Sequence, residues 1–383
     1  MPTLGDILEG KTVCICAGSG GVGKTTTSAA IATGMAAQGL KVCVLTIDPA
    51  KRLADSLGLE ELGNEARRVD PKLFEQQGVE IRGELWAMML DAKATFDELI
   101  ARQAPDEESR DRVLDNRIYQ QISNALAGSQ EYMAMEKLFE LHTENEFDLL
   151  VLDTPPTRNA LDFLDAPKRL TQFIEGKSLR VFMKPTGLAA KVAGRGVSVA
   201  LSVLKRIVGF DLLADLAEFF NAFSGMVDGF QARARRVSKL LADPDTCFLV
   251  ICGPQGEPVE EAVYFHRKLV EAKLPFGGVI VNKVHYPAEH LRGEAVDLPT
   301  ALTEKLGDAD LAQRVAANFS DYQALAERDA RNIEHLAGEL RTKGVIRIPY
   351  LDEDVHDLAG LAEINRYLFA TDEERVAMAA GRA

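Results

Sequence analysis

The sequence predicts an α/β protein in which helices cover both faces of a mostly parallel, doubly wound sheet. Short apolar runs alternate with segments of helical periodicity, which is typical of such sheets. The chain has 383 residues, 46% of them apolar and 27% charged, so it can build a large core. Residues 157–243 hold no convincing strand and indicate a helical subdomain inserted into the sheet domain.

Seven apolar runs are expected to be strands because they are short, rich in Val, Ile and Leu, and bounded by Gly, Pro or Asp. In order they are TVCICA (12–17), KVCVLTI (41–47), ELWAMML (84–90), FDLLVL (147–152), TCFLVIC (246–252), FGGVIVN (276–282) and GVIRIP (344–349). Helices are expected between them, for example from Thr25 to Gln38 and from Glu257 to Ala272. The sheet domain is therefore predicted to comprise residues 1–156 and 244–383.

Charge and cysteine usage exclude several classes of protein. Lys and Arg number 44 against 58 Asp and Glu, and the net charge of −14 argues against binding nucleic acid. The five cysteines lie in apolar runs without a C-x-x-C pair, so neither zinc nor a disulfide framework is indicated. The start lacks the pattern of a signal peptide, and no stretch has the roughly 18 apolar residues of a membrane span. We expect a cytoplasmic protein, and peripheral contact with a membrane stays open.

A glycine-rich loop follows the first predicted strand and opens a predicted helix. AGSGGVGKTTT (17–27) matches the phosphate-loop pattern G-x-x-x-x-G-K-[ST], and this context makes the match specific. Lys24 is placed to reach the β- and γ-phosphates of a nucleotide, Thr25 to offer its hydroxyl to Mg²⁺, and Thr26 to contact the α-phosphate. Backbone N–H groups of the loop are expected to line an anion nest. The predicted phosphate-binding residues are Gly20, Gly21, Val22, Gly23, Lys24, Thr25 and Thr26.

Two more predicted strands lead to aspartates that suit such a site. LLVLD (149–153) places Asp153 at the carboxyl edge, where it would hold Mg²⁺ through water. A turn at 155–157 follows at once and is expected to sense the γ-phosphate. The second strand ends in TIDPAKRLADSLG (46–58), and Asp48 is the candidate for orienting or deprotonating the attacking water. The alternative for Asp48 is to cap the next helix. The predicted catalytic residues are thus Lys24, Asp48 and Asp153.

Five motifs together carry a family resemblance that covers nearly the whole chain. They are SGGVGKTT (19–26), TIDPAKRLAD (46–55), LDTPPTRNAL (152–161), VNKVHYP (281–287) and IRIPYLDEDVHDLAGL (346–361). In this order and spacing the chain resembles the arsenite-pump and guided-entry tail-anchored targeting ATPase family, and most closely its bacterial anion-transporting ATPase-like branch. That family belongs to the deviant-Walker group of P-loop NTPases, with MinD, ParA and nitrogenase iron protein.

The resemblance implies a P-loop fold, ATP and Mg²⁺ as ligands, and ATP hydrolysis by a dimer. It also implies that Asp48 is the switch I aspartate and that residues 153–157 form switch II. Asn282, which ends a predicted strand, matches the asparagine that recognises adenine, and the turn at Pro349 is expected to help enclose the base.

The chain departs from the family in three respects. Ser19 stands where the family has a lysine that crosses a dimer interface to the partner's nucleotide. We expect the missing charge from Arg158 or from a paralogue that retains the lysine, so a homodimer and a heterodimer both stay open. The C-x-x-C zinc clasp of the tail-anchored targeting factors is missing from residues 285–330, and so are the clustered cysteines of the arsenite pump.

Two stretches of the predicted insertion have distinct character. Residues 207–230 show an apolar stripe at helical spacing, which favours either packing within the protein or a groove for a hydrophobic client. Residues 167–206 carry nine Lys or Arg and one acid, which fits either a solvated face or contact with an anionic membrane or acidic partner.

The leading hypothesis is a dimeric ATPase that couples its nucleotide cycle to a hydrophobic client or a membrane partner. One alternative is the energy-coupling subunit of an anion or metalloid exporter, which needs exposed thiol ligands. Another is a positioning switch similar to ParA or MinD, which needs a C-terminal membrane helix or a basic DNA surface.

Overall fold

The computed structural model describes residues 3–48, 51–117, 119–120, 130–155, 166, 219, 222–287, 298–342, 344–351, 355 and 357–380. The chain forms two compact units. The first comprises Met1–Met88, Asn145–Ala160 and Asp243–Ala383, and the second comprises Met89–Glu144 and Leu161–Ala242. The expected insertion, 157–243, thus falls almost entirely in the second unit, together with a preceding segment that the sequence-based division placed in the sheet domain.

An eight-stranded sheet forms the centre of the first unit, in the order β3-β4-β2-β5-β1-β6-β7-β8. The central strands β1, β5 and β6 are buried along their whole length, as expected for strands covered on both faces. Parallel pairs join β2 to β5, β5 to β1, β1 to β6, β6 to β7 and β7 to β8, whereas β3 runs antiparallel to β4. The strands are β1 Val13–Ala17, β2 Lys41–Thr46, β3 Arg67–Arg68, β4 Glu84–Met89, β5 Leu149–Asp153, β6 Thr246–Cys252, β7 Phe276–Val284 and β8 Val345–Pro349.

All seven predicted strands are confirmed, and the fold is the α/β arrangement that the sequence predicts. The additional strand, β3, consists of two exposed arginines at the sheet edge. It escaped prediction because it has neither apolar alternation nor β-branched residues.

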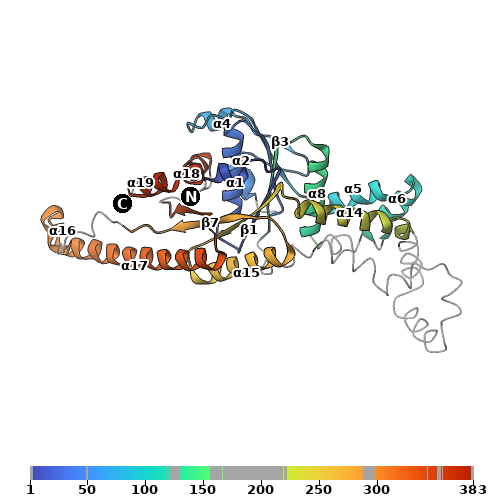
Figure 1. The fold of residues 1–383 in the computed structure, drawn as a ribbon. Helices are drawn as coiled ribbons and strands as arrows, with labels where there is room; N and C mark the ends of the chain where they lie inside the picture. Colours follow the sequence, from blue (N-terminus) through green and yellow to red (C-terminus); the bar gives the residue numbers. More distant parts are fainter. Residues whose placement is uncertain are drawn as a thin grey trace, which may run out of the picture. The chain divides into compact units, whose positions relative to one another are not determined.

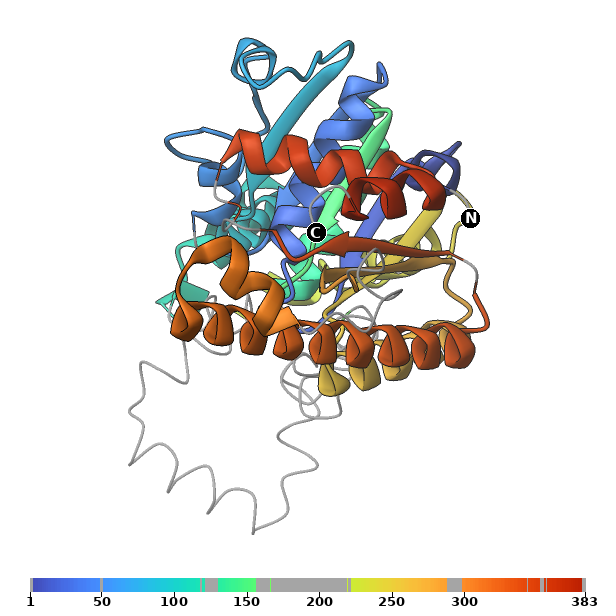
Figure 2. The same cartoon turned by 90° about the vertical axis from the view of Figure 1, so that its left-hand side faces the viewer.

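Helices cover both faces of this sheet, as Figures 1 and 2 show. Helices α2 (Lys24–Ala37) and α18 (Leu358–Phe369) pack together on one face, and α15 (Gly256–Ala272) and α17 (Ala309–Leu340) lie on the other. The predicted helices 25–38 and 257–272 correspond to α2 and α15 within one residue at each end. The remaining described helices of this unit are α1 Leu4–Leu8, α3 Arg52–Ser56, α4 Lys72–Glu75, α16 Leu298–Leu306 and α19 Asp372–Ala380.

The second unit is helical in its described part. Its helices are α5 Ala92–Gln103, α6 Glu107–Leu114, α8 Gln130–Glu144 and α14 Val227–Leu241. A cluster of buried aromatic rings holds it together, with neighbouring centroids 5.1–6.2 Å apart. The members are Phe96, Tyr119, Phe219, Phe223 and Phe230. An ion pair of 2.5 Å between Arg233 and the buried Glu136 joins α14 to α8.

The aromatic cluster contains part of the predicted apolar stripe, residues 207–230. The stripe residues Phe219, Phe223, Met226 and Phe230 are at most 5% exposed, so in the described part the stripe packs within the unit. Val227 of the stripe is partly exposed. The other stripe residues, Leu212, Leu213, Leu216 and Phe220, and the basic stretch 167–206 lie outside the described residues. In the part of the chain that is described, no helix combines the length and apolar character needed to cross a bilayer.

Candidate nucleotide-binding site

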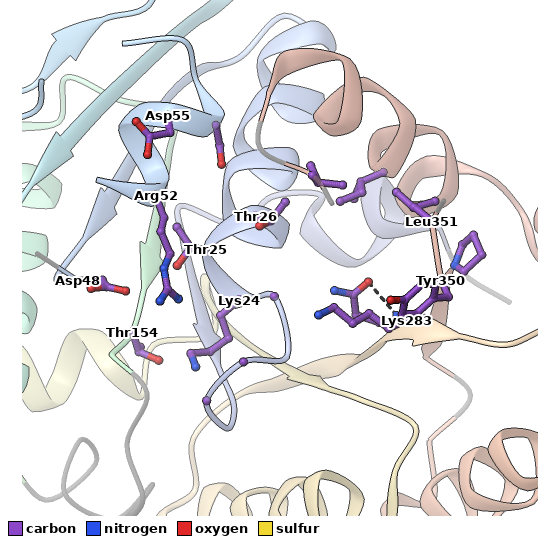
Figure 3. Close-up of a pocket in the computed structure, with 18 residues that line it drawn as sticks. Lys24, Thr25, Thr26, Asp48, Arg52, Asp55, Thr154, Lys283, Tyr350 and Leu351 are labelled. Atoms are coloured by element: carbon purple, nitrogen blue, oxygen red, sulfur yellow. Dashed lines mark hydrogen bonds between the residues drawn. The ribbon is translucent and has the colours of Figure 1, made fainter. Parts of the chain in front are cut away.

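A cavity of about 710 Å³ opens at the carboxyl ends of the parallel strands, in the first unit (Figure 3). This is where open α/β sheets bind ligands, and the volume lies in the usual range for small-molecule pockets. The lining includes most of the site residues that the sequence predicts. They are Gly20, Gly21, Gly23, Lys24, Thr25, Thr26, Asp48, Asn282 and Pro349.

The phosphate loop reaches the cavity in a conformation that favours glycine. Gly21 and Gly23 have φ angles of +77° and +88°, in the left-handed region that other residues rarely adopt. A side chain at Gly23 would also collide with the amide of Asn282. Gly23 caps α2 without a side-chain hydrogen bond, so backbone N–H groups at this helix start are left to a ligand. The loop is thus shaped to bind an anion.

Lys24 is the buried cation of this loop. Its side chain is 6% exposed, and its Nζ donates a hydrogen bond of 2.7 Å to the carbonyl oxygen of Ser19. Burial lowers the pKa of Lys24, although the negative charges of Asp153 and Asp48 oppose the effect. A partly desolvated ammonium group beside an anion-binding loop is well placed for phosphate oxygens. The Ser19 hydroxyl is shielded from solvent and has no hydrogen-bond partner among the described residues.

Asp153 lies behind the loop at the end of β5, where it is 1% exposed. Its Oδ2 accepts hydrogen bonds from the Thr25 hydroxyl at 2.7 Å and from the Thr46 hydroxyl at 2.9 Å. Its Oδ1 is buried and has no partner among the described residues. An unpartnered carboxylate oxygen next to the Thr25 hydroxyl offers the hard oxygen donors that Mg²⁺ prefers. The residues present therefore fit the predicted metal.

Replacing Asp153 with asparagine is expected to stabilise the ligand-free protein at neutral pH. Burial raises the pKa of Asp153 from 3.8 to about 6, so the folded protein keeps this proton to higher pH than the unfolded chain does. The contribution of Asp153 to stability should accordingly fall as pH rises from about 4 to 6, by up to roughly 3 kcal/mol. The Asn variant should not show that loss.

Denaturant unfolding between pH 4 and 7.5, in a chelator and without nucleotide, measures this difference. The matched control is Asp321→Asn on the exposed surface of α17, which should follow the wild type. If the free energy of unfolding depends on pH in the same way in the wild type and in Asp153→Asn, the raised pKa of Asp153 is contradicted.

Asp48 follows β2 and lines the cavity (Figure 3). Its backbone N–H donates to the Thr46 hydroxyl at 3.2 Å, which fixes the point where the chain leaves the strand. The alternative for Asp48, capping the next helix, is not supported, because α3 has Lys51 at its N-cap and no side-chain cap. Asp48 is thus held at the phosphate side of the cavity by its backbone.

Asn282 connects β7 to the phosphate loop, a contact that the sequence did not predict. Its Nδ2 donates to the carbonyl oxygen of Val22 at 2.9 Å, and its Oδ1 accepts the N–H of Lys283 at 2.9 Å. It thereby ties β7 to the phosphate loop. One N–H and one lone pair of its amide remain for a base, so recognition of adenine stays a prediction.

The wall of the cavity opposite Asp48 contains residues that the sequence analysis did not predict. Figure 3 shows Lys283, Tyr350 and Leu351 on the side away from Asp48 and Thr154. The Tyr350 ring stacks on His285, with centroids 5.4 Å apart and planes at 13°. Thr154 belongs to the predicted switch II, residues 153–157, and also lines the cavity. The lining residues that sequence reasoning missed are Arg52, Asp55, Ser56, Lys283, Tyr350, Leu351, Val355 and Ile364. All but Ser56 and Ile364 lie within the five motifs, so position inside a motif was the available signal.

The structure leaves two predicted residues of the phosphate side undescribed. Thr157 of the γ-phosphate sensor and Arg158, a candidate for the missing charge, lie outside the described residues. Within the described ranges, no group of three or more His, Cys, Asp or Glu side chains is arranged to hold a metal ion.

Comparison with known proteins agrees with this geometry. A family model described as "Anion-transporting ATPase" matches residues 11–324. An ATPase GET3 of Malassezia globosa is 34% identical over 374 residues, which cover 96% of this chain and 94% of the relative. An ATPase GET3 of Podospora anserina is 24% identical over 289 residues, covering 75% and 77%. An ATPase ASNA1 homologue of Paramecium tetraurelia is 24% identical over 296 residues, covering 76% and 81%.

Proposed function

The chain belongs to the anion-transporting ATPase family, and from this premise we propose that it is a dimeric ATP-driven switch that captures and releases a hydrophobic client. It is an ATPase of the ArsA-like group, related to GET3 and ASNA1 ATPases. The observation that carries the proposal is the meeting, in one cavity, of the phosphate loop, Lys24 and Asp48, with Asp153 directly behind them.

Each residue of the site has its own role in the proposed hydrolysis of ATP. Loop N–H groups and Lys24 bind the phosphates. The Thr25 hydroxyl and, through water, Asp153 would hold Mg²⁺, which would supply positive charge to neutralise the phosphates. Asp48 orients the attacking water and accepts its proton. The water oxygen forms a bond to the γ-phosphorus, and the bond from that phosphorus to the bridging oxygen breaks. The products are ADP and phosphate.

Client coupling and dimerisation are proposed on separate grounds. Each chain carries one phosphate loop, and the family that it resembles works as a dimer. The second compact unit is separate from the ATPase unit, and we assign client binding to it. The exporter alternative is weakened by the cysteines, because all five are buried and therefore cannot serve as exposed thiol ligands (Cys14, Cys16, Cys43, Cys247 and Cys252).

The proposal is tested with the purified chain and a synthetic apolar helix of about 20 residues, the length of a membrane-spanning segment. With Mg²⁺ and a non-hydrolysable ATP analogue we expect a dimer in analytical ultracentrifugation and capture of the peptide in fluorescence anisotropy. With ADP both should be lost. A peptide of the same length with two central lysines is the control. Equal capture of the two peptides, or capture that ignores the nucleotide, would refute client coupling.

A further inference from the structure

The cavity presents three cationic side chains, Lys24, Arg52 and Lys283, among its described lining residues. Lys24 is buried and hydrogen-bonded to the loop. Lys283 belongs to the wall opposite Asp48, beside Tyr350 (Figure 3). Arg52 extends from α3 toward the phosphate side of the cavity, where Lys24 and Thr154 lie (Figure 3). Arg52 is therefore a second cation, besides Lys24, on the phosphate side of the cavity.

The backbone that carries Arg52 is firmly anchored. Arg52 is the first residue of α3, and the next residues, Leu53 and Ala54, are 1% and 3% exposed. Leu57, at the end of the helix, is fully buried and donates its N–H to the Leu53 carbonyl at 3.1 Å. A short helix fixed by burial positions the exposed Arg52 side chain at the rim of the cavity.

Arg52 carries its positive charge close to Lys24, and burial is the main cause that lowers the pKa of Lys24. The charge of Arg52 also lowers the pKa of that ammonium group. Within the described part of the chain, no carboxylate lies within 4.0 Å of the Arg52 guanidinium to compensate. Lys24 and Arg52 repel each other across a cavity that Asp48 and Asp55 also line, and a polyphosphate beside the two cations would be attracted to both. The arrangement thus favours a highly charged anion.

The serine at position 19 leaves the site without a positive charge that phosphoryl transfer would use. Transfer of a phosphoryl group builds negative charge on the γ-phosphate oxygens, and the family resemblance implies that a lysine at the position of Ser19 would neutralise it. The Ser19 hydroxyl carries no charge. A guanidinium group offers planar paired donors that match phosphate oxygens.

We propose that Arg52 of the same chain neutralises the γ-phosphate during hydrolysis, in place of the lysine that the family supplies across a dimer interface. This inference rests on the ATP cycle proposed above. As the water oxygen bonds to the γ-phosphorus and the bond to the bridging oxygen breaks, Arg52 donates hydrogen bonds to the equatorial oxygens. It takes no proton. Each chain then holds a complete set of catalytic charges.

The test compares Arg52→Ala, Arg52→Lys and, as a matched control, Lys51→Ala, which removes the neighbouring exposed charge. We expect Arg52→Ala to lower kcat at least about 100-fold, since phosphate-stabilising arginines contribute on that scale or more. Affinity for a fluorescent ADP analogue should change less than about 10-fold, whereas added aluminium fluoride should no longer tighten ADP binding. Arg52→Lys should restore part of kcat, and Lys51→Ala should match the wild type.

Mixing variants separates action within one chain from action across an interface. Chains with Lys24→Ala and chains with Arg52→Ala should stay inactive when combined, because no site then has both residues. Recovered turnover in the mixture would overturn the proposal in favour of a charge from the partner. Normal turnover of Arg52→Ala, with loss in Arg158→Ala, would overturn it in favour of Arg158. A wild-type chain that binds no ATP would instead refute the proposed function itself.

Discussion

Lys24→Ala is expected to abolish ATP turnover, with a fall of at least about 100-fold, while the fold stays intact. The reason is the position of the ammonium group, which is 6% exposed and lies among the loop carbonyl of Ser19 and the charges of Asp153 and Asp48. A group that is already partly desolvated gives up little hydration when it meets phosphate, so its contribution to binding and to the transition state is large.

The alanine variant should be as stable as the wild type in the absence of nucleotide, because burial of this charge opposes folding. Turnover is measured by phosphate release, and folding by circular dichroism and thermal unfolding. Lys305→Ala, which removes an exposed charge on α16, is the control and should leave the rate unchanged. Undiminished turnover in Lys24→Ala would place the reaction somewhere other than this loop.

Asp48→Asn should separate binding from hydrolysis. Asparagine has nearly the shape of aspartate, and the backbone bond from residue 48 to the Thr46 hydroxyl does not involve the side chain. The ATP Kd should therefore stay within a few-fold of the wild-type value. Hydrolysis should slow by about 10²–10⁴-fold, since a general base commonly contributes that much.

The comparison variant is Asp55→Asn, because Asp55 is the other carboxylate in the described lining of the cavity. Single-turnover kinetics with saturating enzyme report the hydrolysis step, and fluorescence titration reports binding. Equal single-turnover rates for the wild type and Asp48→Asn would remove the proposed role. A selective loss in Asp55→Asn would transfer that role to α3.

The phosphate side of the site was predictable because its information is local. Gly23, Lys24 and Thr25 are consecutive, and Asp153 is marked by the apolar strand that it ends. Thr46 was not predictable in this way. It reaches Asp153 because β2 and β5 pair in a register that sets the two residues opposite each other. Strand register between distant segments depends on the packing of the whole sheet, which short motifs do not encode.

The residues on the predicted base-binding side of the cavity were likewise only partly predictable from the sequence. Asn282 and Pro349 were expected through family resemblance, and both line the cavity. The bond from Asn282 to Val22 spans 260 positions of the chain, and the stack of Tyr350 on His285 requires the ends of β7 and β8 to meet. Arg52 had no pattern of its own, since an arginine after a strand is ordinarily a solvated residue.

The hydrogen bond between Asn282 and Val22 has a thermodynamic consequence. It joins the phosphate loop to β7, the strand whose Asn282 is predicted to recognise the base. A ligand group that restrains β7 would then also restrain the loop through this hydrogen bond, and a phosphate that orders the loop would restrain β7. The two halves of a nucleotide would then bind with reciprocal coupling, so adenosine and triphosphate joined in one molecule would be held more tightly than the sum of the separate parts suggests.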